Sequence, residues 1–149
     1  MDTKQLRIEI IKPALVFIGH YSKPAEDLVF GTACVESQCG EYICQLNGPA
    51  VGIFQMEPAT HDDIYVNFLK YKPELKAKVM KLFAPGLSVA ENLKSNLMYA
   101  AAMCRIHYLR VSIPIPNDLQ GQAEYWKKFY NTAKGKGSVE KYLKAYKGE

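Results

Sequence analysis

The sequence places one carboxyl group, Glu36, on the apolar side of a predicted helix that ends near residue 37. The residues that share its helix face, at helical spacing, are Leu28, Val29, Thr32 and Ala33. Removing water from a carboxyl raises its pKa, and the negative end of the helix dipole acts in the same direction. Glu36 is therefore a candidate acid for donating a proton to the leaving oxygen of a glycosidic bond. Taken alone, a Glu at a helix end is more often an ion-pair partner of Lys or Arg.

Three short motifs, each weak singly, occur along the chain. They are Glu36-Ser37, G-I-F-Q from Gly52 to Gln55, and Tyr130-Asn131 within F-Y-N-T-A-K-G. In this order they resemble the catalytic domain of the soluble lytic transglycosylases, which are related to goose-type lysozyme. The landmarks of that family are an E-S pair, a G-L-M-Q-like element and an A-Y-N-x-G-like element. The resemblance covers most of the chain from residue 36 to residue 137.

The resemblance implies a role for each motif residue. Glu36 would be the acid/base, and Ser37 beside it would support the fold or the substrate. The G-I-F-Q turn would bring backbone groups and the Gln55 amide against the sugar. Tyr130 would reach Glu36, and Asn131 would anchor the floor of the cleft. These residue types suit the roles, because an amide binds sugar without competing for protons and a phenol can orient a carboxyl.

The chain departs from the family pattern in the third motif. The T-A-K segment at 132–134 displaces the glycine expected soon after Tyr130-Asn131, which leaves the shape of that loop open. Outside the motif trio, plain structural roles are the simpler interpretation. Gln55 would then be a surface residue, and Tyr130 would fill the core beside Trp126.

A second catalytic carboxylate is not evident, although retaining and inverting glycosidases usually need two. The other nearby acids are Glu41, Glu57, Asp62 and Asp63. The resemblance implies a lytic transglycosylase, in which Glu36 protonates the glycosidic oxygen of the MurNAc-GlcNAc bond and then deprotonates the sugar's 6-hydroxyl. That hydroxyl closes a 1,6-anhydro ring, and the N-acetyl group can stabilise the oxocarbenium-like state. Hydrolysis, as in a muramidase, stays open if Asp62, Asp63 or Glu41 folds back across the cleft.

Two other classes of function stay open. A lysozyme-like fold can serve as a structural or wall-binding virion protein with weak or no catalysis, because fold does not guarantee activity. A basic helical nucleic-acid binder would rest only on residues 127–147, which carry seven lysines and one acid. We interpret these lysines as a solvated helix face and expect no nucleic-acid partner.

The four cysteines, Cys34, Cys39, Cys44 and Cys104, are predicted to be free thiols. Cys34 and Cys104 are expected in the core, while Cys39 and Cys44 could approach each other across a loop. The spacing of the first three does not match the close pairs of structural zinc sites, and the three histidines share no motif. We therefore expect no metal and no cofactor.

The length of 149 residues suits a single domain, 1–149. No stretch approaches the roughly 18 consecutive apolar residues of a membrane span, and the start lacks a signal-peptide layout. We expect a protein made in the cytoplasm whose partner is the glycan strand of peptidoglycan. A phage virion-associated lysin, placed beside other virion or tail proteins, is the favoured setting, and an endolysin released through a holin is the alternative.

Apolar periodicity predicts a mostly α, α+β lysozyme-like fold: a compact bundle of about six or seven helices with at most a small β-hairpin. Pro13 is expected to kink or split the first helix. Expected caps are Ser22, Ser88 with Glu91, Asn117 or Asp118, and Ser138. The expected helices cover about 3–19, 22–37, 58–69, 73–83, 88–111, 118–130 and 138–146, with a loop and small hairpin at 38–56. The long helix at 88–111 is expected to form the core.

Overall fold

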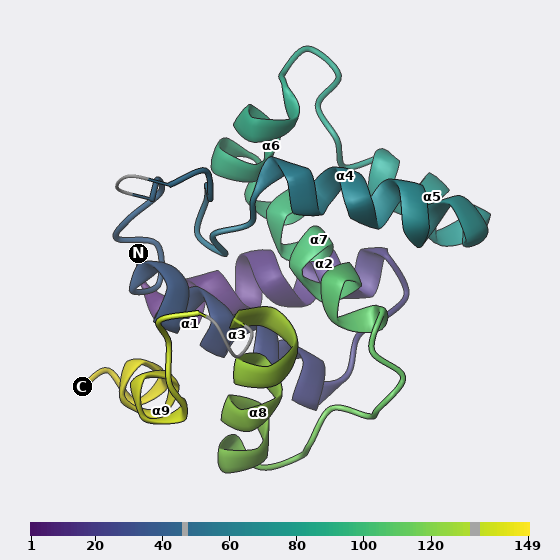
Figure 1. The fold of residues 1–149 in the computed structure, drawn as a ribbon. Coiled ribbons are helices and arrows are strands. Elements are labelled where there is room, and N and C mark those ends of the chain that lie inside the picture. Colours follow the sequence, from purple (N-terminus) through teal and green to yellow (C-terminus); the bar gives the residue numbers. More distant parts are fainter. Residues whose placement is uncertain (46–47, 132–134) are drawn as a thin grey trace.

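The structure is a computed structural model that describes residues 1–45, 48–131 and 135–149. Helices make up most of this part of the chain, which confirms the predicted mostly α bundle (Figure 1). None of the described helices is long and apolar enough to cross a membrane. The α-helices are α1 (Thr3–Gln5), α2 (Lys12–Phe17), α3 (Lys23–Ser37), α4 (Pro58–Asn67), α5 (Pro73–Met80), α6 (Val89–Ser95), α7 (Leu97–Leu109), α8 (Leu119–Trp126) and α9 (Val139–Lys147). Wider π-helical turns cover Leu6–Ile11 and Lys127–Asn131, and a 3₁₀ turn covers Leu69–Tyr71.

The first helical stretch passes through Pro13 without ending. A proline has no N–H to donate, and its ring clashes with the carbonyl four residues earlier in a regular helix. Here the π-helical turn Leu6–Ile11 precedes it, and the Lys12 N–H donates to the carbonyl of Arg7, five residues back. The widened turn accommodates the proline, so the expected split does not occur.

The helix predicted over 88–111 is interrupted, and that part of the prediction is wrong. The capping box of Ser88 and Glu91 does start α6, but Asn96 leaves helical geometry and separates α6 from α7. Its side-chain oxygen accepts the N–H of Tyr99, and its amide donates to the Leu82 carbonyl at 2.7 Å. An Asn side chain can compete with the helical backbone in this way, and it starts a new helix while fastening the preceding loop.

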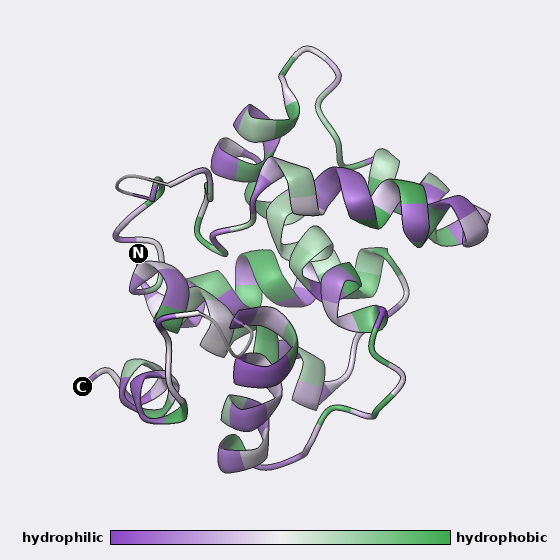
Figure 2. Ribbon diagram, viewed as in Figure 1, coloured by the Kyte–Doolittle hydropathy of each residue, from purple (hydrophilic) through white to green (hydrophobic). Residues whose placement is uncertain are grey.

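The buried helix α7 connects two apolar clusters. One face contributes Ala101, Cys104 and Tyr108 to a cluster with α2, α3, α8 and α9. The opposite face contributes Met103 and Ile106 to a cluster with α4, α5 and α6. In Figure 2 the outer helices α5, α8 and α9 carry hydrophilic segments (purple) beside hydrophobic ones (green), as expected of helices that bury one side in these clusters. The expectation that this segment forms the core is therefore confirmed for α7.

The turn at 52–55 lies between these two clusters. Val51 forms isolated antiparallel bridges with Cys44 and Met56, in place of the expected hairpin strands in the described part of 38–56. The Val51 and Met56 backbones exchange hydrogen bonds of 3.1 and 3.2 Å, which close residues 52–55 into a tight turn. Phe54 packs in the first cluster and Met56 in the second. The turn is therefore held between the two apolar clusters by a side chain packed in each.

The prediction of four free thiols is wrong, because Cys34 and Cys39 form a disulfide. Gln38 and Cys39 have φ angles of 51° and 56°, so the chain reverses directly after α3 and brings the two Cα atoms to 4.1 Å. No disulfide joins Cys39 to Cys44, since Cys39 is bridged to Cys34 and Cys44 is an exposed free thiol. Cys104 is free and buried, as expected for a core residue.

Titration of the unfolded protein without reductant is expected to find two reactive thiols, and four after reduction. The measurement is a thiol-reagent count on the denatured chain. The bridge closes a short loop, so replacing both Cys34 and Cys39 by Ser is expected to lower the free energy of unfolding by about 2 kcal/mol. Four thiols in the unreduced protein would show that the bridge is absent.

Candidate active site

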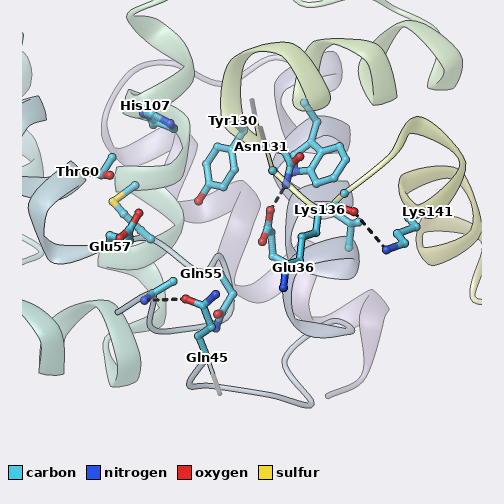
Figure 3. Close-up of a pocket in the computed structure, with 16 residues that line it drawn as sticks. Glu36, Gln45, Gln55, Glu57, Thr60, His107, Tyr130, Asn131, Lys136 and Lys141 are labelled. Carbon is cyan, nitrogen blue, oxygen red and sulfur yellow. Dashed lines mark hydrogen bonds between the residues drawn. The ribbon is translucent and has the colours of Figure 1, made fainter. Parts of the chain in front are cut away.

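A cleft of about 550 Å³ lies against the C-terminal end of α3 (Figure 3). Its walls come from segments distant in sequence: the end of α3, Gln45, the 50–57 segment, α4, α7, and described residues of the chain around α8 and α9. The residues that line it are Val35, Glu36, Gln45, Ala50, Gln55, Met56, Glu57, Thr60, His107, Trp126, Tyr130, Asn131, Gly135, Lys136, Gly137 and Lys141. Four of the six residues predicted to form the site are among them.

The last turn of α3 carries Glu36 into this cleft, where its carboxyl meets the indole of Trp126. The indole Nε1–H donates to the Glu36 Oε1 atom at 3.2 Å. Burial raises the pKa of the Glu36 carboxyl from 4.5 to about 7, and the indole hydrogen bond offsets only part of that rise. Near neutral pH both the acid and the carboxylate are therefore well populated. Such a group can donate a proton and then recover one.

An ion-pair role for Glu36 finds no support in the structure. The ion pairs among the described residues lie elsewhere, and none includes Glu36. At the other end of α3, by contrast, Arg7 binds Glu26 at 2.8 Å and also binds Asp27. Ion pairs thus stabilise the N-terminal end of α3, whereas the carboxyl at its C-terminal end has no ion-pair partner in the described ranges 1–45, 48–131 and 135–149.

Ser37 supports the fold and does not contact the cleft. Its side chain is buried, its hydroxyl donates to the Ala33 carbonyl at 2.9 Å, and it accepts the Gly40 N–H at 2.9 Å. These bonds satisfy backbone groups at the end of α3 and hold the reversed turn that follows. Of the two roles that the resemblance implied, the structure shows the contacts of the first, support of the fold, and does not place Ser37 on the cleft wall.

Gly52 shapes the turn at 52–55 rather than binding substrate. Its φ is +82°, and a Cβ atom there would lie 2.0 Å from the Leu93 carbonyl oxygen. The residue is buried and is not part of the cleft wall, so the structure does not place this predicted substrate-binding residue with the others. Its carbonyl accepts the Gln55 Nε2–H at 2.8 Å. This bond fixes the Gln55 side chain, which does line the cleft.

Tyr130 lines the cleft, but the prediction that its hydroxyl reaches Glu36 is wrong. The hydroxyl donates to the Phe54 carbonyl at 2.5 Å, which ties the helix end after α8 to the 52–55 turn. The side chain that bonds the Glu36 carboxyl is Trp126 instead of Tyr130. Sequence reasoning treated Trp126 as a core residue, although its spacing of one helical turn from Tyr130 placed both on the same face.

Asn131 lines the cleft and is held by Lys127, whose Nζ atom donates to the Asn131 Oδ1 at 2.7 Å. The same ammonium donates to the Gly135 carbonyl at 3.1 Å, so it links the two ends of the following loop. Asn131 thus lies on the cleft with Glu36, and its expected role in anchoring the cleft floor stays a prediction. The departure from the family pattern at 132–134 lies outside the described residues.

Of the four candidate second carboxylates, one lines the cleft and three do not. Asp62 contacts the imidazole of His61 at 3.0 Å, and Asp63 forms an ion pair with Arg110 at 2.7 Å. Neither lines the cleft, nor does the exposed Glu41, so none of the three folds back across it. Glu57 does line the cleft, near Thr60 (Figure 3). Among the described residues, no group of three His, Cys, Asp or Glu side chains could hold a metal ion.

Replacing Glu36 by Gln is expected to stabilise the protein near pH 8 but not near pH 4. The folded pKa of about 7 exceeds the reference value of 4.5, so the unfolded chain ionises first as the pH rises. The stabilising effect of the buried neutral acid is complete below pH 4.5 and is lost as the pH rises to about 7. The free energy of unfolding that wild type loses over this pH range is roughly 3 kcal/mol. Glu36→Gln does not lose it and should therefore melt several degrees above wild type near pH 8.

Thermal melts of wild type and variant across this pH range check the prediction. The matched control is Glu41→Gln, which changes an exposed carboxyl and should leave the difference flat with pH. An equal effect of Glu36→Gln at both ends of the range would contradict the raised pKa.

The cleft combines a partly protonated carboxyl, a fixed side-chain amide and an aromatic wall, an arrangement suited to proton transfer on a sugar. Lys136 and Lys141 line its rim and can attract an anionic ligand. Comparison of the chain with family models, with curated proteins and with solved structures finds no match.

Proposed function

We propose that this protein cleaves the MurNAc-GlcNAc bond of peptidoglycan as a lytic transglycosylase. The observation that carries the proposal is Glu36, a carboxyl that forms no ion pair with any residue the structure describes and whose pKa is raised to about 7 in an open cleft. The order of the three sequence motifs supports the substrate class, and Gln55, Tyr130 and Asn131 line the same cleft. The rim lysines suit the carboxylates of a peptide-bearing glycan better than they suit an uncharged one.

In the proposed first step, protonated Glu36 gives its proton to the glycosidic oxygen as the bond from that oxygen to the anomeric carbon breaks. In the second step, the Glu36 carboxylate takes the proton of the 6-hydroxyl on the same MurNAc. The hydroxyl oxygen bonds to the anomeric carbon and closes the 1,6-anhydro ring. Glu36 ends protonated, so one carboxyl serves both steps and no water is consumed.

Hydrolysis is the second candidate, and Glu57 is the observation that favours it. This carboxylate lines the same cleft as Glu36, on the wall that also holds Thr60. A muramidase would use it as a base to activate water or as a nucleophile. The two candidates predict different products, since the anhydro product is lighter than the hydrolytic product by one water.

Digestion of purified peptidoglycan sacculi, followed by mass spectrometry of the released fragments, tests the proposal. Anhydro-muropeptides in the wild-type digest, and their loss with Glu36→Gln, are expected. Fragments with ordinary reducing ends would establish hydrolysis instead. Failure to release any Glu36-dependent fragment from several wall types would contradict both candidates and favour a wall-binding or structural protein.

A further inference from the structure

His107 lies on α7 and reaches the wall of the cleft that also holds Glu57 and Thr60 (Figure 3). The motifs that pointed to Glu36 gave this histidine no role. Its ring packs edge-on against Tyr130, with 4.9 Å between the ring centroids. His107 therefore lines the same cleft as Glu36. Its ring orientation is restricted by Tyr130, whose hydroxyl is bonded to the 52–55 turn.

The tautomer of His107 follows from its partner. The Arg110 Nη2 atom lies 3.0 Å from the His107 Nδ1 atom. A guanidinium is always protonated and can only donate, so Nδ1 must accept, and the proton of the neutral ring is on Nε2. Arg110 is in turn fixed by Asp63 on α4, with 2.7 Å between the Nη1 and Oδ2 atoms. Two helices thus set the ring orientation.

The charge state of His107 agrees with this geometry. Burial lowers the pKa of the imidazole from 6.5 to about 4, and the Arg110 charge acts in the same direction against a smaller opposing effect of Asp63. The ring is therefore neutral near pH 7. His107 therefore lines the cleft as a neutral residue and does not compete with Glu36 for protons.

The Nε2–H of His107 is available to a ligand. In the part of the chain that the structure describes, no hydrogen bond engages His107 Nε2, and this atom is not among the buried polar atoms that lack a partner. The Nε2 atom is therefore accessible to solvent, and the residue that carries it lines the cleft. Arg110, the cation beside the ring, is paired with Asp63, and Glu57 lines the same cleft, so no excess positive charge favours a carboxylate there and the matching acceptor is an uncharged oxygen.

We propose that His107 is a substrate-binding residue that donates its Nε2–H to an uncharged oxygen, an acetamido carbonyl or a hydroxyl, of a sugar in the arm of the cleft beside Glu57 and Thr60. This inference rests on the proposed function, because it takes the ligand to be an N-acetylated glycan. Arg110 and Asp63 are positioning residues for this contact. The cleft then has an uncharged sugar arm at His107 and a basic arm at Lys136 and Lys141.

The test is a binding titration in which N-acetylglucosamine tetrasaccharide is added to the full chain carrying Glu36→Gln. NMR spectra recorded at each addition are the readout. Nitrogen-detected spectra of the free protein are expected to show Nε2 protonated and Nδ1 as acceptor, and the Nε2 resonance is expected to move on titration. In the same background, His107→Phe keeps an aromatic ring but removes the donor, and it should weaken binding about fivefold to tenfold. His107→Gln, which retains an N–H donor, should recover part of the loss.

The matched control is His20→Phe, which changes a half-buried histidine outside this cleft and should leave binding unchanged. Binding that shifts the Trp126 indole but leaves His107 Nε2 unmoved, with His107→Phe binding as tightly as the control, would overturn this inference and leave the proposed function standing. A ring protonated on Nδ1 would also overturn it. Absence of any tetrasaccharide binding would count against the inference and the proposed function together.

Discussion

Glu36→Gln is expected to lower the rate of wall solubilisation about a thousandfold, within the range usual for loss of a general acid–base group. Gln keeps the size of the side chain and an oxygen that can accept the Trp126 indole N–H, so the cleft should retain its shape. The carboxyl proton is lost, and with it both proposed proton transfers. The measurement is the initial rate of fragment release from sacculi near neutral pH.

Glu57→Gln is the matched control for this loss, because it changes another carboxyl on the same cleft. A single-carboxyl mechanism predicts a decrease of less than about tenfold for this variant, whereas a two-carboxyl hydrolysis predicts a loss comparable to that of Glu36→Gln. Circular dichroism of each variant checks that the fold is intact. Activity that survives Glu36→Gln within a few-fold would contradict the assignment of Glu36.

Gly52→Ala is expected to lower Tm by about 10 °C or more and to abolish activity. The new Cβ would meet the Leu93 carbonyl oxygen at 2.0 Å, and that oxygen belongs to the backbone of α6, which cannot move aside as a flexible side chain could. The φ of +82° adds strain for any residue with a side chain. Displacement of the turn would also move Gln55 and the Phe54 carbonyl that Tyr130 binds.

Gly86→Ala provides the comparison, since a Cβ at that position meets no atom within 4 Å. This variant should melt within a few degrees of wild type and keep full activity. If Gly52→Ala melted as Gly86→Ala does, the close approach of the 52–55 turn to α6 would be wrong.

The local features of the fold could be predicted from the sequence. Caps depend on residues three positions apart, and Ser22, Asp118 and Ser138 each accept the backbone N–H that the spacing suggested. The face of α3 that carries Glu36 likewise follows from helical periodicity within one element. For the same reason, burial of Glu36 beside apolar neighbours could be anticipated without knowledge of the rest of the chain.

The features that the sequence did not reveal depend on contacts between distant segments. Trp126 meets Glu36 across 90 positions of the chain, and no local pattern distinguishes this indole from a core residue. His107 gains its fixed tautomer only when Asp63 on α4 orients Arg110. The Cys34 to Cys39 bridge requires two consecutive residues with positive φ, which neither Gln38 nor Cys39 signals by its type.

The proposed acid role requires that the cleft keep the Glu36 carboxyl largely protonated at pH values where an ordinary Glu is fully ionised. A carbon-detected NMR titration of the Glu36 carboxyl measures this most directly, with Glu36→Gln used to assign the resonance. The expected midpoint is about 7, above the reference value of 4.5. A midpoint near 4.5 would leave almost no protonated Glu36 at neutral pH and would contradict its role as the acid.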